Sequence, residues 1–305
     1  MGNAGTVFNQ VLILFIIMLI GFIAKKRGIF NSTVNKKLSE LLLKVTSPLL
    51  VISSFQVEFT QDILKNVLIV FAFAMSSHIV SILLGQFLFR HCDKESCKIM
   101  KFAAIYSNCG YMGFPLLASL FGSTGVLYGS VYVAAFNIFL WTNGVMIFSE
   151  EKKLDRQTIK KVLLHPGIVS VAIGIVLFIF SLKLPVPLAS AVDMVGSMTS
   201  PLSMLIIGSV IADCEFKKLF KGWNLYYITA VRLILIPLLA FAALKLLGLP
   251  NELLKVCVLL VAMPIATATA IFAELYDGDT IFASRTVVMS TLLSIITIPL
   301  FMMFA

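Results

Sequence analysis

The chain has 305 residues, of which 59% are hydrophobic and 13% are charged, and its formal net charge is +9. Soluble domains carry about 25% charged residues, so a water-soluble globule is excluded because this supply of charge could not solvate its surface. The basic charge does not indicate nucleic-acid binding, since Lys and Arg gather in the cytoplasmic loops of membrane proteins and no nucleic-acid recognition motif is present. The composition predicts an all-α polytopic membrane protein in a lipid bilayer.

Ten apolar segments, each about long enough to cross a bilayer, are separated by charged or turn-rich residues. They are residues 6–24, 38–55, 65–89, 100–121, 125–148, 166–184, 188–211, 223–247, 253–273 and 281–304. No Lys or Arg precedes the first segment, which is therefore expected to be a retained span rather than a cleaved signal. Eighteen of the 24 Lys and Arg residues fall in the loops after odd-numbered spans and four in the other loops. The positive-inside rule then predicts a cell-membrane protein with both termini outside.

The two halves of the chain resemble each other at an offset of 153 residues. The tetrapeptide Thr-Ser-Pro-Leu occurs at residues 46–49 in span 2 and at residues 199–202 in span 7. A glycine and an acid recur at the same offset, as Gly21 with Gly174 and Glu40 with Asp193. Because each half has five spans, an odd number, the halves are predicted to be inverted repeats. The expected organisation is a first five-helix repeat at 1–149, a short cytoplasmic linker at 150–165 and a second repeat at 166–305.

Spans 4 and 9 both contain residues that interrupt a helix. Span 4 contains Asn108, Gly110, Gly113 and Pro115, and span 9 contains Pro264, Thr267 and Thr269. Proline removes a backbone donor and glycine tolerates non-helical geometry, so both spans are predicted to be broken near the midplane. Amides at the N-termini of half-helices carry partial positive charge and would bind an anion such as a carboxylate. The alternative is a pair of kinked packing helices.

These segments resemble the auxin efflux carrier family, which includes plant auxin exporters and bacterial malate and malonate carriers. The resemblance covers the whole chain and rests on the region of Pro48 and on residues 108–115, 263–264, 273–276 and 290–299. It implies ten helices in two inverted repeats, with spans 4 and 9 crossing at prolines and Asn108 holding the substrate carboxylate beside the crossing. Span 6 opens with His165-Pro166 instead of the family's usual Asn-Pro, which leaves His165 as an open candidate for a polar substrate contact.

Glu40 and Lys44 lie one helical turn apart in span 2 and can form an ion pair. The resemblance implies that they match the family's acid and lysine pair. A carboxylate whose protonation switches its bond to lysine would couple proton movement to transport, and a purely structural ion pair is the alternative. Asp193 occupies the corresponding place in span 7 without a lysine, because residue 197 is serine.

Two further polar residues are expected deep in the membrane. Arg232 could clamp a substrate carboxylate, pair with Asp193 or Glu274, or extend its charge toward the surface. His78 could relay protons or serve as a hydrogen-bonded packing residue. The sequence alone leaves these alternatives open.

The sequence therefore predicts a secondary transporter of a small organic anion, a carboxylate such as malate, malonate or an auxin-like acid, that works by alternating access. A symporter or exchanger coupled to H⁺ or Na⁺ is a second reading, although residues 108–115 and 263–270 contain no Asp or Glu. A ligand sensor lacks a signalling domain here, and an enzyme or ATP-driven pump lacks its motif. Five scattered cysteines predict neither disulfides nor a metal site. No cofactor is expected, and a homodimer is compatible with the sequence.

Overall fold

The computed structural model describes residues 4–90, 92–148, 160, 163–213 and 220–305. All regular elements within these residues are helices. Ser107 and Ile265 in addition form an isolated β-bridge. The predicted linker at 150–165 lies mostly outside the described residues, which include only 160 and 163–165 of it. The prediction of an all-α protein is confirmed.

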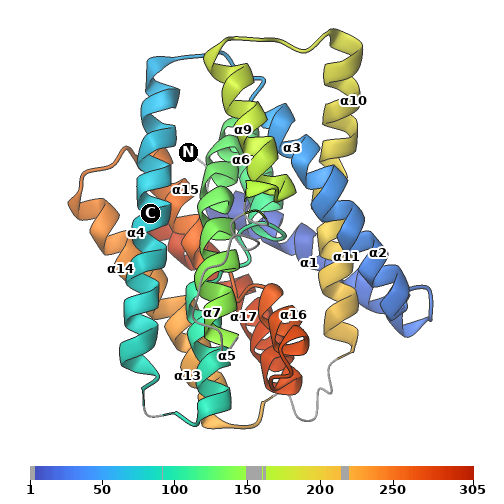
Figure 1. The fold of residues 1–305 in the computed structure, drawn as a ribbon, viewed down its shortest axis with the longest axis vertical. Helices are drawn as coiled ribbons and strands as arrows, with labels where there is room; N and C mark the ends of the chain where they lie inside the picture. The colour runs from blue at the N-terminus through green and yellow to red at the C-terminus, as the bar shows by residue number, and fades with distance from the viewer. Residues whose placement is uncertain (1–3, 91, 149–159, 161–162, 214–219) are drawn as a thin grey trace.

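The first half of the chain forms α1 (Ala4–Lys26), α2 (Ser32–Leu41), η1 (Leu42–Thr46), α3 (Ser47–Ser54), α4 (Gln61–Leu88), α5 (Lys94–Ile105), α6 (Gly113–Phe139), η2 (Leu140–Gly144) and α7 (Val145–Phe148). The second half forms α9 (Pro166–Ile179), α10 (Val186–Ser197), α11 (Thr199–Ala212), α13 (Trp223–Ala230), η3 (Val231–Leu235), α14 (Ile236–Leu246), α15 (Asn251–Ala262), α16 (Ala268–Leu275) and α17 (Thr280–Phe304). Most of them run roughly along the long axis of the molecule (Figure 1).

Six helices in the described residues are long and apolar enough to cross a membrane: Val7–Lys26, Gln61–Leu88, Gly113–Phe148, Val186–Ala212, Trp223–Leu246 and Thr280–Phe304. A further apolar helix, Pro166–Ile179, is shorter. The predicted spans 2, 4 and 9 consist of shorter consecutive helices instead of one long one. The helical, multi-pass character of the protein is thus confirmed, and the count of ten spans stays a prediction.

Polar side chains mark where several of these helices begin. The side chains of Asn31, Thr60, Asp93 and Asp279 each accept a hydrogen bond from the backbone N–H three residues later, at 2.8 to 3.2 Å. Such caps satisfy amides that have no partner inside the helix. The loop residues that separate the apolar segments therefore also determine the starts of α2, α4, α5 and α17.

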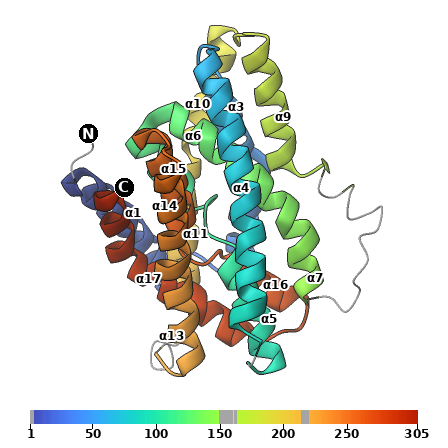
Figure 2. The same cartoon turned by 90° about the vertical axis from the view of Figure 1, so that its left-hand side faces the viewer.

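The helices form two groups. One contains α1, the α2–η1–α3 segment, α9, α10 and α11. The other contains α4, α5 and α13 to α17, and α6 contacts both groups. Figure 2 shows α4, α5 and α13 to α15 on the near side, seen at right angles to Figure 1.

Glycines allow very close helix contacts within the first group. A Cβ atom on Gly208 of α11 would lie 1.8 Å from the carbonyl oxygen of Met18 in α1. One on Gly21 of α1 would lie 2.2 Å from the carbonyl oxygen of Leu205. Gly174, which corresponds to Gly21 at the offset of 153, lies against Phe55, with 2.4 Å from its hypothetical Cβ to the ring. The α1–α11 contact thus has a counterpart between α9 and the end of α3.

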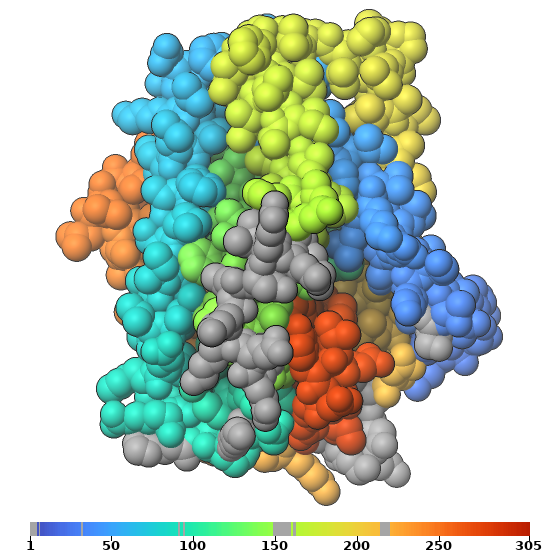
Figure 3. Space-filling model, in the orientation of Figure 1, coloured from blue at the N-terminus to red at the C-terminus, as the bar shows by residue number. Residues whose placement is uncertain are grey.

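The exterior of the molecule is apolar along its length. Leu68, Leu83 and Phe87 of α4 are 60 to 64% exposed, and Val186 and Met194 of α10 are more than 70% exposed. Figure 3 shows α4 along one edge of the molecule and α9 and α10 at one end, with their side chains on the outer surface. Large apolar side chains in such positions are stable when they contact lipid. The outer face of these helices is therefore a lipid-facing surface.

Candidate functional site at two interrupted helices

Two unwound segments meet inside the second helix group. The first, residues 106–112, separates α5 from α6, and the second, residues 263–267, separates α15 from α16. The backbone N–H of Asn108 donates to Pro264 O at 2.8 Å, and that of Ala266 donates to Tyr106 O at 3.0 Å. This antiparallel pairing joins the two breaks directly, so the interruptions predicted from the sequence lie against each other.

The prolines and glycines of the two interruptions lie at different places relative to the paired segments. Pro264 lies within its unwound segment, but Pro115 is the third residue of α6 and lies beyond the pairing. A proline suits this first turn because its missing N–H would have no partner within the helix. Neither Gly110 nor Gly113 is among the residues with positive φ, so the first break does not depend on left-handed glycine geometry.

Two serines attach the unwound segments to neighbouring helices. Ser107 Oγ donates to Leu260 O of α15 at 3.1 Å, across a separation of 153 residues. The backbone N–H of Ile265 donates to Ser290 Oγ of α17 at 3.1 Å. Because both serines are buried, these bonds satisfy backbone groups that water cannot reach.

Arg232 donates hydrogen bonds to carbonyl groups at the ends of α5 and α15, the helices that precede the two unwound segments. It lies in η3 and is 1% exposed. Its guanidinium donates to Ala104 O of α5 at 3.0 Å, to Val261 O of α15 at 2.5 Å and to Met263 O at 3.2 Å. Such terminal carbonyls have no partner within their own helix.

The position of Arg232 excludes two of the alternatives that the sequence left open, pairing with an acid and extension of the charge toward the surface. The ion pairs among the described residues join Lys25 to Asp213, Glu40 to Lys37 and Lys44, and Glu95 to Lys98. Arg232 therefore pairs with neither Asp193 nor Glu274, and its burial shows that its charge does not reach the surface.

Several donors beside the paired segments have no hydrogen-bond partner. Asn108 is 3% exposed and its Nδ2 is unpaired. Thr269 is completely buried and its Oγ1 is also unpaired. Among the described residues, the backbone N–H groups of Thr267 and Ala268 make no backbone hydrogen bond. Buried polar groups are usually satisfied, so this set of free donors marks a place where an acceptor can bind.

A cavity of about 390 Å³ opens beside the second unwound segment, where Thr267 lines it, whereas Asn108, Ala268 and Thr269 are not part of its lining. Tyr111 and Thr267 of the two unwound segments line it together with residues of α2, α11, α16 and α17. The volume is in the range of small-molecule sites, which begins at about 300 Å³. Its polar lining side chains are Ser39, Tyr111, Asp213, Thr267, Glu274, Thr280, Ser284 and Arg285.

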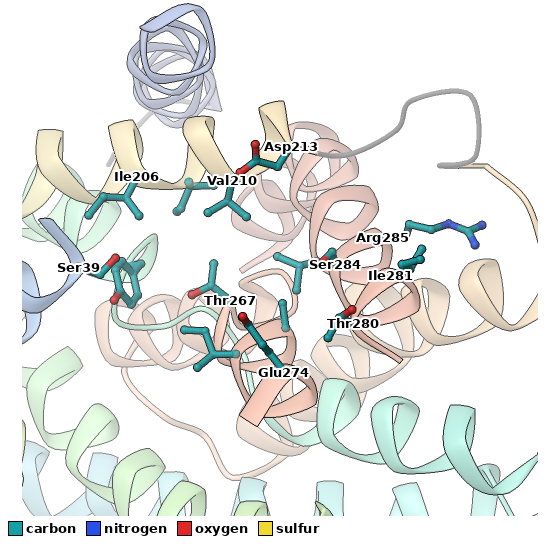
Figure 4. Close-up of a pocket in the computed structure, with 15 residues that line it drawn as sticks. Ser39, Ile206, Val210, Asp213, Thr267, Glu274, Thr280, Ile281, Ser284 and Arg285 are labelled. Atoms are coloured by element: carbon teal, nitrogen blue, oxygen red, sulfur yellow. The ribbon is translucent and has the colours of Figure 1, made fainter. Parts of the chain in front are cut away.

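The charged groups of the cavity differ in their surroundings. Figure 4 shows Thr267 and Glu274 directed into the central space, and Arg285 directed away from it. Arg285 donates to Lys221 O, and Asp213 forms an ion pair with Lys25 at 3.0 Å. Within the described part of the chain, Glu274 forms no ion pair, so its carboxylate is the acid that faces the cavity without a cation beside it.

The sequence reasoning did not place Glu274 or Tyr111 in the site. Residues 267, 270, 271 and 274 line the cavity at helical spacing along α16. This spacing is the sequence signal that could have placed Glu274 in the site, since positions seven apart lie on one face of a helix. Tyr111 follows Asn108 by three residues, and it lines the cavity together with Ser39 of α2. The cavity therefore lies between the first unwound segment and the other helix group.

The predicted coupling residues lie apart from this cavity. Glu40 accepts from Lys44 at 2.5 Å and from Lys37 at 3.1 Å, and the Glu40 side chain is 40% exposed. Asp193 accepts from Ser53 Oγ at 2.8 Å, between α10 and α3. Neither acid lines the cavity.

The two candidate histidines have local partners. His78 is 1% exposed, its Nδ1 bonds Ala74 O at 2.7 Å and its ring stacks on Phe139 at 5.1 Å. His165 caps α9, because its Nδ1 accepts from Gly167 N at 3.2 Å. Burial lowers the pKa of His165 from its ordinary value, which favours the neutral ring that can accept this bond. Neither histidine lines the cavity.

A multi-pass helical protein whose interrupted helices meet beside a polar cavity belongs to the class of membrane transporters. The chain matches the membrane transport protein family over residues 6–302 and is a member of it. The resemblance to auxin efflux carriers is thereby confirmed.

Individual relatives cover the chain to different extents. An "Uncharacterized transporter" of Methanothermobacter thermautotrophicus is 23% identical, and the match covers 98% of this chain and 97% of the relative. Another from Methanocaldococcus jannaschii is 24% identical over 96% of both chains. A "Putative malonate transporter" of Rhizobium meliloti is 26% identical over 70% of this chain and 69% of its own.

Proposed function

We propose that the protein is a secondary transporter of a small organic carboxylate, bound where the two unwound segments meet. The observation that carries this proposal is the set of unpaired donors, Asn108 Nδ2 with the amides of Thr267 and Ala268, beside a cavity lined by Thr267. A carboxylate has only acceptor sites when ionised, and it would satisfy such donors. Gly110, Gly113, Pro115 and Pro264 would shape the backbone around it, and Thr269 would add a hydroxyl.

The local charge favours an anion. The amide end of α16 carries partial positive charge, and the first turns of α6 and α16 contain no acid. The name of the Rhizobium relative supports a small dicarboxylate such as malonate, and malate or an auxin-like acid are further members of this class.

Alternating access requires two bodies that move relative to each other. The proposed architecture has ten spans in two inverted repeats, residues 1–149 and 166–305. The recurring glycine contacts and the bond across 153 residues between Ser107 and Leu260 support it. In this proposal the group that contains the unwound segments moves against the group of α1, α3, α9, α10 and α11, in the cell membrane, with both termini outside.

The test is ligand binding to purified Asn108→Ala, measured as a thermal shift with malonate and malate and with their diamides. A ligand at about 100 times its Kd adds about 2.7 kcal/mol to the free energy of unfolding. We expect the wild type to be stabilised by an acid and not by its diamide, and Asn108→Ala to lose that shift.

The matched control is Asn66→Ala, which removes an asparagine whose Nδ2 donates to Tyr128 OH at 3.0 Å, outside the cavity lining. It should retain the ligand shift. An unchanged shift in Asn108→Ala would contradict the proposed binding site, and binding without uptake into proteoliposomes would favour a sensor.

Proton coupling is a second candidate property, favoured by the unpaired carboxylate of Glu274 in the cavity. The ion pair of Glu40 with Lys44 remains our alternative coupling site, with Asp193 as its counterpart in span 7. Uptake driven by a pH gradient in the absence of sodium would support coupling to H⁺, and a strict requirement for sodium would replace it with Na⁺.

A further inference from the structure

We propose that Arg232 determines the preference of this site for anions, as a buried permanent cation that acts through the backbone rather than by touching the substrate. The proposal rests on the proposed function and adds the group that sets the charge of the ligand. Arg232 is then a positioning and selectivity residue, in contrast to Asn108, which is proposed to contact the carboxylate.

The guanidinium of Arg232 contacts both interrupted helices. Its Nη1 reaches Ala104 O near the end of α5, while its Nη2 and Nε reach Val261 O and Met263 O at the end of α15. One side chain therefore binds the carbonyl ends of both interrupted helices. Within the described residues, all three hydrogen bonds of the guanidinium go to backbone oxygens.

The helix ends and the guanidinium of Arg232 together set the charge at the paired segments. A helix terminus is equivalent to about half an elementary charge, negative at the carbonyl end and positive at the amide end. Two carbonyl ends, of α5 and α15, and two amide ends, of α6 and α16, come together at the paired segments, so their partial charges cancel. Arg232 adds one positive charge, because a guanidinium keeps its proton in proteins. The net charge at the meeting point is then about +1.

In the part of the chain that the structure describes, no acid within ion-pair distance compensates the charge of Arg232, and the Glu274 carboxylate, which faces the cavity, is not paired with it. Arg232 itself is 1% exposed. The unwound segments 106–112 and 263–267 contain no Asp or Glu. Burying a charge costs free energy unless neighbouring groups compensate it, and the carbonyl oxygens supply only part of this compensation. An anion bound at the neighbouring donors would supply the rest.

Arg232 lies in a π-helical turn, residues Val231–Leu235, between α13 and α14. Such turns are rare in proteins, and those that occur are often found at functional sites. Within this turn Arg232 is 1% exposed and Ile234 is 53% exposed.

The experiment compares Arg232→Gln and Arg232→Lys with wild type and with Lys245→Gln, which removes an exposed cation from α14 of the same predicted span. The ratio of the Kd for malonamide to the Kd for malonate is measured for each. We expect Arg232→Gln to lower this ratio by at least about tenfold, which corresponds to about 1.4 kcal/mol. Lys245→Gln should leave it unchanged.

Arg232→Lys separates charge from geometry. It retains the cation but cannot bind three carbonyls in fixed directions, so we expect a lower thermal midpoint with the malonate preference retained. If only Arg232→Lys folds, its ratio alone decides: a retained preference supports the proposal and a lost preference overturns it. Equal weakening of malonate and malonamide in Arg232→Gln would indicate a purely structural role.

The outcomes also separate this inference from the proposed function. Wild-type protein that does not prefer malonate or malate over the diamides contradicts the carboxylate site itself. Wild-type protein that prefers the acid, with the preference unchanged in Arg232→Gln, contradicts only the role of Arg232.

Discussion

The backbone N–H of Asn108 donates to the carbonyl oxygen of Pro264 at 2.8 Å, and this bond joins the interruptions of two helices that are 156 residues apart in the chain. The backbone of Asn108 is thus held in place while its side-chain Nδ2 stays free. A backbone committed to structure and a side chain left for a ligand is the arrangement that a preorganised site requires.

Ser290→Ala should loosen the second unwound segment. The substitution removes the acceptor for Ile265 N, and a buried amide without a partner costs about 1–3 kcal/mol. We therefore expect a lower thermal midpoint for the detergent-solubilised protein, together with weaker malonate binding.

The control is Ser294→Ala, one turn further along α17. Ser294 is also completely buried, but its hydroxyl donates to Thr291 O of its own helix. It should cost less stability and leave malonate binding intact. Equal effects of the two substitutions would show that the bond to Ile265 has no special importance.

Gly208→Ala should destabilise the contact between α1 and α11. The added Cβ would lie 1.8 Å from Met18 O, so the backbones must separate, and overpacking of this kind costs about 1–3 kcal/mol. Gly5→Ala is the matched control, because a Cβ at Gly5 of α1 has nothing within 4 Å. The unfolding midpoints of both variants measure the difference, and a wild-type midpoint for Gly208→Ala would disprove the close contact.

The cap of α9 predicts a pH effect on stability. The pKa of His165 is lower in the folded protein than its ordinary value of 6.5, because burial disfavours the charged ring. The unfolded chain then binds the proton more readily, so the free energy of unfolding should fall as the pH decreases below about 6.5. Protonation also removes the acceptor for Gly167 N.

His165→Asn tests this effect, since asparagine can cap a helix without titrating in this range. Thermal midpoints of the variant and the wild type, measured from pH 8 to pH 5, should differ mainly at the acidic end. Parallel curves over the whole range would exclude His165 as the source of the pH dependence.

Proton coupling predicts a different result for two acids. Because Glu274 faces the cavity and lacks a cation partner, Glu274→Gln should flatten the pH dependence of malonate uptake into proteoliposomes. Glu95→Gln, which removes an exposed acid paired with Lys98 on α5, should not. A normal profile for Glu274→Gln together with an altered one for Glu40→Gln would move the coupling to the ion pair in span 2.

The interruptions of the two helices could be predicted because their signals are local. The prolines and glycines near Asn108 and the proline at position 264 indicate interrupted helices, whichever residues surround them. Gly110 and Gly113 do not have positive φ, and the first break is joined to the second by backbone hydrogen bonds, so their role beside the substrate stays a prediction. Pro115 lies in the first turn of α6.

Partners that lie far apart in the sequence could not be predicted. The sequence leaves Arg232 as a substrate clamp, a partner for an acid or a cation that reaches the surface. Its partners in the structure are backbone carbonyls, which every residue has and which no sequence pattern marks. Glu274 was assigned to a motif rather than to the cavity, because its place depends on how α16 packs against α11 and α17.

Hydropathy, charge in loops and proline act over a few residues at a time, so they are enough to predict a multi-pass helical membrane protein with two interrupted helices. The pairing of the interruptions, the bonds of Arg232 to both carbonyl ends and the direction of Glu274 into the cavity are seen only in the folded chain. The bonds in these relations join residues from 29 to 160 positions apart in the chain, so the packing of separate helices, and not local preference, selects the partner.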